Sequence, residues 1–476
     1  MTAILDRPDW LTAVNTLDVR DWTVPTEAGR LPAVGHPHAP GLSIHGAGNH
    51  VPLTRGGTIE YANLDHGASA PALQVVVDTV NKLLETYASV HRGAGWHSAV
   101  CTSLYEGARG PVRQFVGGRA DDAVIFTKHT TDSFNLLSHC LPKGTTVVVF
   151  ETEHHAALLP WSRHRVIRLK APATPDAAVE AVDTALRHRP AGPALLVITG
   201  ASNVTGEVWP VDRLAATARS RGARIALDAA QLAPHRAFSI AELGVDYVAL
   251  SGHKLYAPYG SGALVGRADW LQDAPPYLIG GGATATVTDD ETTYKPVPER
   301  HEAGSPNVPG AVALATACHV LAGADREELA RTEAALTRAL WDGLADIPGV
   351  TLHRLWGTEE ADAIGVVTFT IAGQSSPVVA AALSAEHGIG VRDGAFCAQP
   401  FVRHLLGTAG CSIPDGTGHA LRASVGLGTT AEHVHRLVAA VEQIASRGPR
   451  LRYELVDGRP RPVADDREIP AIAPWQ

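Results

Sequence analysis

Short apolar runs alternate with longer amphipathic stretches through the middle of the chain, from about residue 58 to residue 300. The runs at 145–150, 194–199, 224–228 and 246–250 are rich in aliphatic residues, which is typical of strands buried on both faces of a parallel sheet. The amphipathic stretches between them would form helices that cover those faces. The pattern therefore predicts an α/β fold built on a large, mostly parallel sheet.

The pattern changes after about residue 310. Leu329, Leu336 and Leu340 recur at helical spacing, the apolar segment 365–371 is typical of a strand, and apolar residues between 434 and 444 follow one face of a last helix. These elements predict a second, smaller α/β unit in the C-terminal third.

Four segments follow from these changes of pattern. We predict a large domain at 58–308 and a small C-terminal domain at 309–449. Residues 1–57 are rich in Pro, Gly and His with little periodicity, and residues 450–476 carry several prolines. We expect these two segments to form an N-terminal extension and a tail.

Composition narrows the class of protein. The net charge is −9, which argues against nucleic acid or an acidic membrane surface as a partner. The first residues lack the basic and apolar regions of a signal peptide, and no apolar run approaches the about 18 residues of a membrane span. Five scattered cysteines without CxxC spacing suit a reducing cytoplasm. We expect a soluble cytoplasmic enzyme without a metal site.

Lys254 and Asp228 carry the most specific chemistry. Asp228 ends the apolar run 224–228, and Lys254 follows the run 246–250. The carboxyl ends of parallel strands open into the crevice where α/β sheets bind ligands. A lysine that forms a Schiff base with an aldehyde, together with a carboxylate that pairs with a pyridinium nitrogen, is the combination that pyridoxal 5'-phosphate requires. We therefore predict this cofactor.

Ten short motifs then occur in one order along the chain. They are LDHGASA at 64–70, VHRG at 90–93, TTD at 130–132, EHHA at 153–156, SNVTG at 202–206, DAAQ at 228–231, SGHK at 251–254, EAGSPN at 302–307, VRDGAFCA at 391–398 and LRAS at 421–424. With them the chain resembles the class V aminotransferase superfamily, and most closely its cysteine desulfurase and selenocysteine lyase branch. The resemblance covers about residues 61–444 and implies the type I fold of pyridoxal-phosphate transferases.

The resemblance and the residue chemistry together give a set of cofactor-binding residues. They are Thr130, Thr131, His154, Asn203, Asp228, Gln231, Ser251, His253, Lys254 and Ser305. We expect Thr130, Thr131, Ser251 and His253 to hold the phosphate, with help from a helix that begins at Thr130. The resemblance implies that Ser305 reaches the phosphate of the neighbouring subunit, and hence a homodimer with shared active sites.

Further site residues are expected to contact the substrate and the cofactor ring. His154 follows the run 145–150, and its ring could stack on the cofactor and also act as acid or base; the resemblance places it there, with His155 as the second candidate. The amide of Gln231 is expected to meet the phenolic oxygen. Arg422 is expected to bind the carboxylate of an amino acid, because a guanidinium is its bidentate partner, with Asn203 beside it. Catalysis would then rest on Lys254, His154 and Cys397.

Cys397 decides which reaction is expected. It occupies the position where desulfurases carry the cysteine that accepts sulfur as a persulfide. However, Ala395 and Phe396 replace the two histidines that precede this cysteine in one desulfurase group, and more residues than usual, Cys411 among them, separate it from Arg422. Cys397 is therefore either the sulfur acceptor or a thiol that lines the pocket.

Three functions follow from these observations. The first is cysteine desulfurase, with a sulfur amino acid as substrate and a possible sulfur-acceptor protein as partner. The second is a C–S lyase that cleaves a cysteine S-conjugate by β-elimination, or another specialised enzyme of secondary metabolism. His129, where a small residue is usual, and the N-terminal extension favour such a remodelled pocket. The third, a scaffold that has lost catalysis, conflicts with the presence of Lys254, Asp228, His154 and Arg422.

Overall fold

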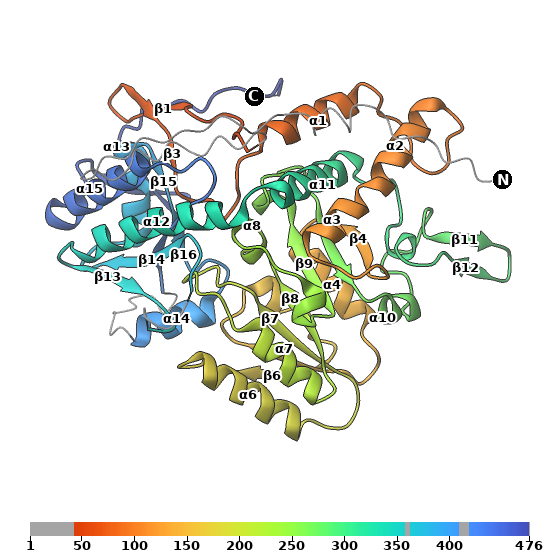
Figure 1. Ribbon diagram of the computed structural model, residues 1–476. Coiled ribbons are helices and arrows are strands. Elements are labelled where there is room, and N and C mark those ends of the chain that lie inside the picture. Colours follow the sequence, from red (N-terminus) through yellow and green to blue (C-terminus); the bar gives the residue numbers. More distant parts are fainter. Residues whose placement is uncertain (1–41, 358–361, 409–417, 476) are drawn as a thin grey trace.

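The computed structural model describes residues 42–357, 362–408 and 418–475. Within these residues the centre of the molecule is a seven-stranded sheet with the strand order β4-β10-β9-β8-β7-β5-β6 (Figure 1). The strands are β4 (Ala123–Thr127), β5 (Thr146–Phe150), β6 (Arg165–Leu169), β7 (Ala194–Thr199), β8 (Arg224–Asp228), β9 (Tyr247–Ser251) and β10 (Gly262–Gly266).

This large sheet is mostly parallel, as predicted. The strands from β6 to β9 pair in parallel, whereas β10 runs antiparallel to both β9 and β4. The four apolar runs of the sequence correspond to β5, β7, β8 and β9. The prediction of four central parallel strands is confirmed. The antiparallel strand β10 was not predicted from the sequence.

Side chains of each strand alternate between two apolar layers. In β5, Val147 and Val149 pack with α4 (Thr130–Cys140), α5 (His155–Leu158) and α10 (Ala268–Asp273). Val148 and Phe150 point to the opposite layer, because successive strand residues face opposite sides. That layer holds α1 (Gln74–Leu84), α2 (Trp96–Gly107), α3 (Arg109–Phe115), α6 (Pro175–His188), α7 (Val211–Ser220) and α11 (Val308–Gly323).

A smaller antiparallel sheet lies in the C-terminal part, with the strand order β13-β14-β17-β16. Its strands are β13 (Val350–His353), β14 (Val366–Ile371), β16 (Arg392–Gly394) and β17 (Ala420–Ser424). A separate apolar core joins this sheet to α12 (Arg326–Ala345), α13 (Ser376–His387) and α15 (Ala431–Arg447). The predicted second α/β unit is therefore present, and the domain boundaries at 58, 309 and 449 stay a prediction.

The described ends of the chain both contact elements of the small C-terminal unit. β3 (Ala62–Asn63) pairs in parallel with β15 (Ile389–Gly390), and β1 (His50–Pro52) forms a hairpin with β2 (Thr58–Glu60). A second hairpin, β18 (Tyr453–Val456) with β19 (Arg459–Pro462), packs near α13. Most of the predicted N-terminal extension, residues 1–41, lies outside the described residues.

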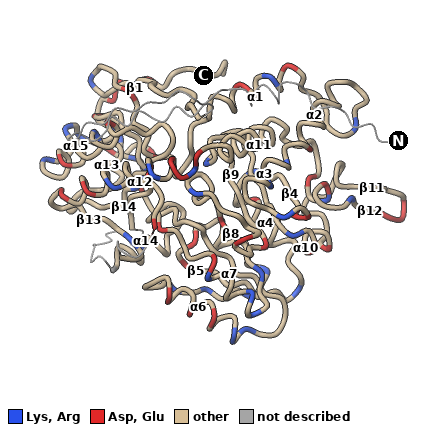
Figure 2. The backbone as a smooth tube through the Cα atoms, in the orientation of Figure 1, with Lys and Arg blue, Asp and Glu red and all other residues tan. Residues whose placement is uncertain are grey.

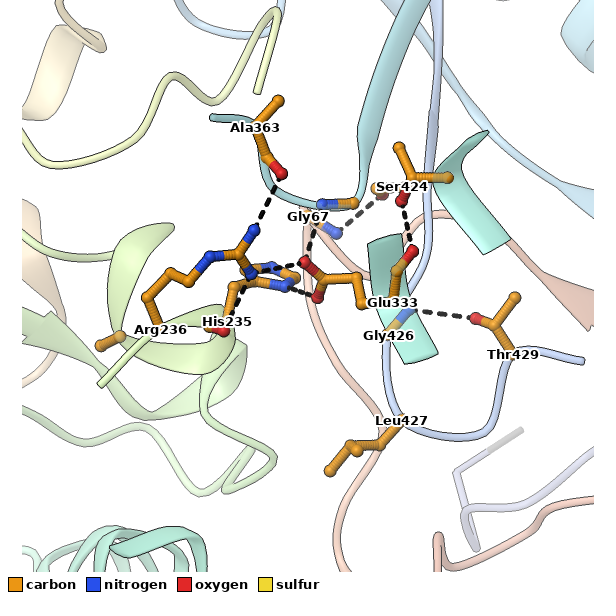
Figure 3. A network of polar contacts seen from close by, with 12 residues as sticks. Gly67, His235, Arg236, Glu333, Ala363, Ser424, Gly426, Leu427 and Thr429 are labelled. Atoms are coloured by element: carbon orange, nitrogen blue, oxygen red, sulfur yellow. Dashed lines mark hydrogen bonds and ion pairs between the residues drawn. The ribbon is translucent and has the colours of Figure 1, made fainter. Parts of the chain in front are cut away.

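A largely buried polar network joins the large unit to the small unit (Figure 3). His235 is the last residue of α8 (Leu232–His235) of the large unit and Arg236 follows it, while Glu333 projects from α12. The Nη1 atom of Arg236 donates to Glu333 at 3.1 Å, Nδ1 of His235 also contacts this carboxylate, and the N–H of Gly365 donates to it at 3.1 Å. Burial alone would raise the pKa of Glu333, but His235 and Arg236 hold it below its ordinary value. Glu333 thus ties α12 and the start of β14 to the large unit.

Acidic and basic residues are interspersed over both units rather than gathered on one element (Figure 2). Among the described helices, none alone is long and apolar enough to cross a membrane, while α11 and α12, bent by 90° at their junction, meet that criterion only when taken together.

Candidate active site

The predicted site residues of the large unit converge at one edge of its sheet. Each lies at or after the carboxyl end of a strand. These ends share one edge, because β4 runs in the same direction as β9, both being antiparallel to β10, and α/β sheets bind ligands at such an edge. Along the chain these residues are Thr130 after β4, His154 after β5, Asn203 after β7, Asp228 at the end of β8 and Lys254 in the 3-10 helix η3 (Gly252–Lys254) after β9.

Lys254 and Asp228 lie close enough for each charge to change the pKa of the other group. Burial lowers the pKa of the Lys254 ammonium to about 8, although Asp228 opposes the change. Burial also raises the pKa of Asp228, against a hydrogen bond of 2.9 Å from the N–H of Ala230 and the charge of Lys254. Lys254 is therefore an amine that loses its proton near neutral pH, and Asp228 is a buried carboxylate that a cation would stabilise.

His154 is a neutral imidazole at the start of α5. Its Nδ1 accepts the N–H of Ala156 at 3.0 Å, which leaves the ring proton on Nε2. Burial and the charge of Lys254 lower the pKa of His154 to about 3. A neutral ring suits stacking on a pyridine, and this role of His154 stays a prediction.

Thr130 and Ser251 form a buried hydroxyl pair at the N-terminus of α4. Ser251 Oγ accepts the N–H of Thr130 at 2.9 Å and lies 2.8 Å from its Oγ1. A Cβ at Gly262 would lie 2.8 Å from the Cα of His129, so glycine lets β10 approach the start of this helix closely. The N–H groups and dipole of a helix of 11 residues favour an anion there.

The other predicted phosphate residues are placed differently. Thr131 is exposed beside Thr130, and His253 is half-buried, with its pKa lowered to about 4 by burial and by Lys254. Ser305 is exposed between the 3-10 helix η4 (Glu299–His301) and α11. No hydrogen bond joins Ser305 to Thr130 or Ser251 in the described part of the chain.

The two predicted amide ligands already have protein partners. Gln231 Nε2 donates to the carbonyl of Gly67 at 2.6 Å, and Asn203 Nδ2 donates to the carbonyl of Phe396 at 2.8 Å. Each amide keeps its side-chain oxygen for another partner. The Gln231 contact also ties the motif at 64–70 to the large unit.

Arg422 is buried in β17 with one donor unsatisfied. Its Nη1 donates to the carbonyl of Asn203 at 2.8 Å, and its Nη2 lies 3.2 Å from Oδ1 of Asp65. Its Nε is buried without a partner among the described residues. A buried guanidinium N–H without a partner is costly, and a carboxylate ligand would satisfy it.

Cys397 projects from a tight turn between β16 and α14 (Gln399–Thr408). The N–H of Ala398 donates to the carbonyl of Ala395 at 2.8 Å, and the two residues between them are Phe396 and Cys397. The side chain of Cys397 is exposed. Its charge contributes to the pKa of both Lys254 and Arg422, so the thiol lies at the same site as these two cations. Cys411 lies outside the described residues.

Two acidic residues of the site were not assigned a role from sequence. Asp65 contacts Arg422, and Glu153 is fully buried beside Asp228 with its Oε1 accepting the N–H of Thr199 at 3.0 Å. Burial and the charge of Asp228 raise the pKa of Glu153 well above its ordinary value. Asp65 lies in the motif LDHGASA and Glu153 in the motif EHHA. Their place in these motifs was the sequence feature that could have assigned them to the site.

The donor set fits pyridoxal phosphate. An amine that titrates near neutral pH, a buried carboxylate, a neutral imidazole and hydroxyls at a helix N-terminus meet at one sheet edge. Within residues 42–357, 362–408 and 418–475, no group of three or more His, Cys, Asp or Glu side chains is placed to hold a metal ion.

Comparison with known proteins agrees with this arrangement. The family model for aminotransferase class-V matches residues 62–437. A cysteine desulfurase of Pectobacterium atrosepticum is 33% identical over 399 residues, which cover 80% of this chain and 93% of that protein. A probable cysteine desulfurase of Mycolicibacterium paratuberculosis is 35% identical over 81% of this chain, and the match spans only 55% of that longer protein.

Solved structures give the same result. The cysteine desulfurase CsdA of Escherichia coli has a TM-score of 0.69 and 30% identity, covering 81% of this chain and 95% of that one. A cysteine desulfurase of Thermococcus onnurineus NA1 has a TM-score of 0.71 and 28% identity over the same shares. The chain therefore belongs to the class-V aminotransferase family, and it is similar to the cysteine desulfurases of that family in both sequence and fold.

Proposed function

We propose that this protein is a pyridoxal-phosphate-dependent cysteine desulfurase that converts L-cysteine to L-alanine and takes up the sulfur as a persulfide on Cys397. The observation that carries the proposal is the exposed Cys397 thiol, on a turn that the N–H of His155 and the amide of Asn203 hold at the edge of the large sheet. The charge of this thiol acts on both Lys254 and Arg422. A β-eliminating lyase needs no thiol there.

The residues of the sheet edge would hold the cofactor. Lys254 would bind its aldehyde carbon, Asp228 would pair with its ring nitrogen, and the ring of His154 would stack on its face. Thr130, Thr131, Ser251 and His253 would bind its phosphate. When bound, pyridoxal phosphate stabilises negative charge at the Cα atom of an amino acid.

Arg422 would receive the substrate carboxylate. Its buried Nε lacks a partner, while its Nη1 is held by the carbonyl of Asn203. A carboxylate at this guanidinium would place the rest of a small amino acid between Lys254 and Cys397. Asn203 would act beside Arg422, since its backbone already orients the guanidinium.

Lys254 and His154 would move the protons. Lys254, with a pKa of about 8, changes protonation state near neutral pH and can take and return the Cα proton. His154 is neutral with a proton on Nε2, so it can donate that proton to a group on the cofactor face.

Cys397 would take the sulfur. Its thiolate attacks Sγ of the substrate, a new S–S bond forms and the Cβ–Sγ bond breaks. The electron pair of that bond stays with the substrate, whose Cβ gains a proton and becomes the methyl group of alanine. The transferred sulfur keeps its own proton, and the proton that Cβ gains balances the one that Cys397 gives up as it becomes a thiolate. The carbon is reduced while the sulfur is oxidised, so no external oxidant is required.

Further parts of the proposal rest on the family. The family's homodimer with shared active sites would bring Ser305 of one subunit to the phosphate of the other. A cytoplasmic location and a sulfur-acceptor protein also belong to the proposal, because a persulfide must be passed on.

A product assay tests the proposed reaction. The protein is loaded with pyridoxal phosphate and incubated with L-cysteine and a reducing thiol. The proposal predicts alanine and sulfide in equal amounts, and Lys254→Ala should form neither. Pyruvate and ammonia instead of alanine would assign β-elimination, and turnover only of S-substituted cysteines would contradict the desulfurase.

A further inference from the structure

The turn that carries Cys397 has an uncommon backbone conformation. Phe396 and Cys397, its two central residues, have φ values of 51° and 54°. Turns with two left-handed residues in a row usually contain Gly, Asn or Asp, because a Cβ atom is crowded in this region. Neither residue here relieves that crowding, so the surroundings must hold the turn in place.

Two hydrogen bonds from the large unit hold the carbonyl groups of this turn. Asn203 Nδ2 donates to the carbonyl of Phe396, and the N–H of His155 donates to the carbonyl of Cys397, each at 2.8 Å. Asn203 lies in the loop that follows β7, and His155 is the first residue of α5, the helix that follows β5. The backbone of the thiol-bearing turn is therefore attached to the sheet edge that carries His154 and Asn203.

The side chain of Phe396 holds the turn from its other side. Its ring is 7% exposed and packs in a small apolar cluster with Val204, Phe401 and Leu405. The guanidinium carbon of Arg422 lies 5.3 Å from the centroid of the same ring. A cation over an aromatic face is attracted most strongly where water is excluded, and Arg422 is 3% exposed.

Asn203, Phe396 and Arg422 thus form a closed triangle of contacts. The Asn203 amide binds the carbonyl of Phe396, Arg422 binds the carbonyl of Asn203, and Arg422 covers the ring of Phe396. Cys397 is the next residue along the chain. A shift of Phe396 would therefore move the guanidinium and the thiol together.

We propose that Phe396 is a positioning residue that fixes the Cys397 thiol and the Arg422 guanidinium relative to each other, and that this fixed spacing selects amino acids whose sulfur is attached to Cβ. This inference rests on the proposed function, in which Arg422 binds the carboxylate and Cys397 takes the sulfur. A longer amino acid such as L-homocysteine, with its sulfur on Cγ, would place that atom away from a thiol that cannot follow it.

Three variants of the full-length, cofactor-loaded protein separate positioning from packing. Phe396→Ala removes both the packing of Phe396 in the apolar cluster and the aromatic ring under Arg422. Phe396→Leu keeps an apolar side chain in the cluster, which we call the anchor, but loses the ring. Phe401→Leu is the matched control, because Phe401 is buried in the same cluster and makes no ring contact with Arg422 among the described residues. Each is compared with the wild type for KM, kcat and the preference for L-cysteine over L-homocysteine.

Two readouts need no turnover. The first is the rate at which iodoacetamide alkylates Cys397, measured by peptide mass spectrometry. The second is hydrogen exchange of the Ala398 amide, which closes the turn. We expect Phe396→Ala to raise the KM for L-cysteine about tenfold, to speed alkylation and exchange at least about threefold, and to lower the preference for L-cysteine.

We expect Phe396→Leu to raise KM about threefold with alkylation and exchange near the wild-type rates, because the anchor stays. Phe401→Leu should lower stability only. A folded Phe396→Ala protein with wild-type KM, selectivity, alkylation and exchange would overturn the proposal. If Phe396→Ala does not fold, an unchanged KM in Phe396→Leu overturns it instead. If the wild-type protein makes no alanine, the proposed function is wrong. The alkylation and exchange rates would still test whether Phe396 holds the Cys397 turn in place.

Discussion

Oδ1 of Asp65 lies 3.2 Å from Nη2 of Arg422. The guanidinium that we expect to receive the substrate carboxylate therefore already has a carboxylate beside it. Arg392 contributes a second positive charge near the same aspartate, with its Nη1 3.9 Å from Oδ2. Asp65 balances this positive charge in the absence of substrate, and it competes with an incoming anion.

Removing the charge of Asp65 should strengthen substrate binding. Asp65→Asn keeps an oxygen beside Arg422 but not its negative charge, so we expect the KM for L-cysteine to fall about threefold at low salt. Asp78→Asn, at an exposed aspartate of α1, is the control and should leave KM unchanged. A KM that rises in Asp65→Asn would instead assign the aspartate to holding Arg422 in place.

Capture of the cofactor by the apoprotein should depend on the ionisation of Lys254. Only the deprotonated amine attacks an aldehyde, and the pKa of Lys254 is lowered to about 8. The rate of capture, followed by absorbance or by trapping with borohydride, should therefore rise with pH and level off above about pH 8. If the rate of capture keeps rising up to the ordinary pKa of a lysine, about 10.4, then burial does not lower the pKa of Lys254.

Ser251 should matter for phosphate binding beyond its effect on stability. Ser251→Ala removes a hydroxyl that also accepts the N–H of Thr130, and hydrogen bonds to charged groups are worth about 1.5–3 kcal/mol. We expect the dissociation constant of pyridoxal phosphate to rise at least about tenfold, measured by equilibrium dialysis. Ser133→Ala is the control. Ser133 is a buried residue of α4 whose hydroxyl bonds that of Thr127, so this variant should bind the cofactor as the wild type does.

The network around Glu333 should stabilise the contact between the large unit and the small unit. Glu333→Ala leaves His235 and Arg236 without their buried carboxylate, a change that costs about 3 kcal/mol in comparable cases. The midpoint of thermal unfolding of the apoprotein should drop by several degrees. Glu328→Ala in the same helix removes only a surface pair with Arg331 and should change it little. Equal midpoints in the two variants would show that the network is not important for stability.

The strands at the centre of the large sheet could be predicted because each is an uninterrupted apolar run. The Asp228 and Lys254 pair followed from the same runs, since the carboxyl ends of parallel strands share one edge. The direction of β10 could not be predicted. Its residues are as apolar as those of β9, and local pattern does not determine whether a buried strand runs parallel or antiparallel.

The contacts that orient the substrate side of the site were not predictable from local sequence. Arg422 meets Asp65 across 357 positions, and Asn203 meets Phe396 across 193. The turn at Cys397 gave no signal either, because its left-handed residues are not the usual Gly or Asn. The backbone partners of the Gln231 and Asn203 amide nitrogens were not predictable for the same reason, since both are distant carbonyls. The predicted contacts of the two amides with the cofactor stay a prediction.

The most direct test of the proposed reaction is the mass of the Cys397 peptide after a single turnover with L-cysteine, without a reducing thiol. We predict that this peptide gains the mass of one sulfur atom while one alanine is released per site. Cys397→Ala should abolish both, and Cys411→Ala should leave both unchanged. An unmodified Cys397 peptide, or alanine formation that survives Cys397→Ala, would contradict the assignment of Cys397 as the sulfur acceptor.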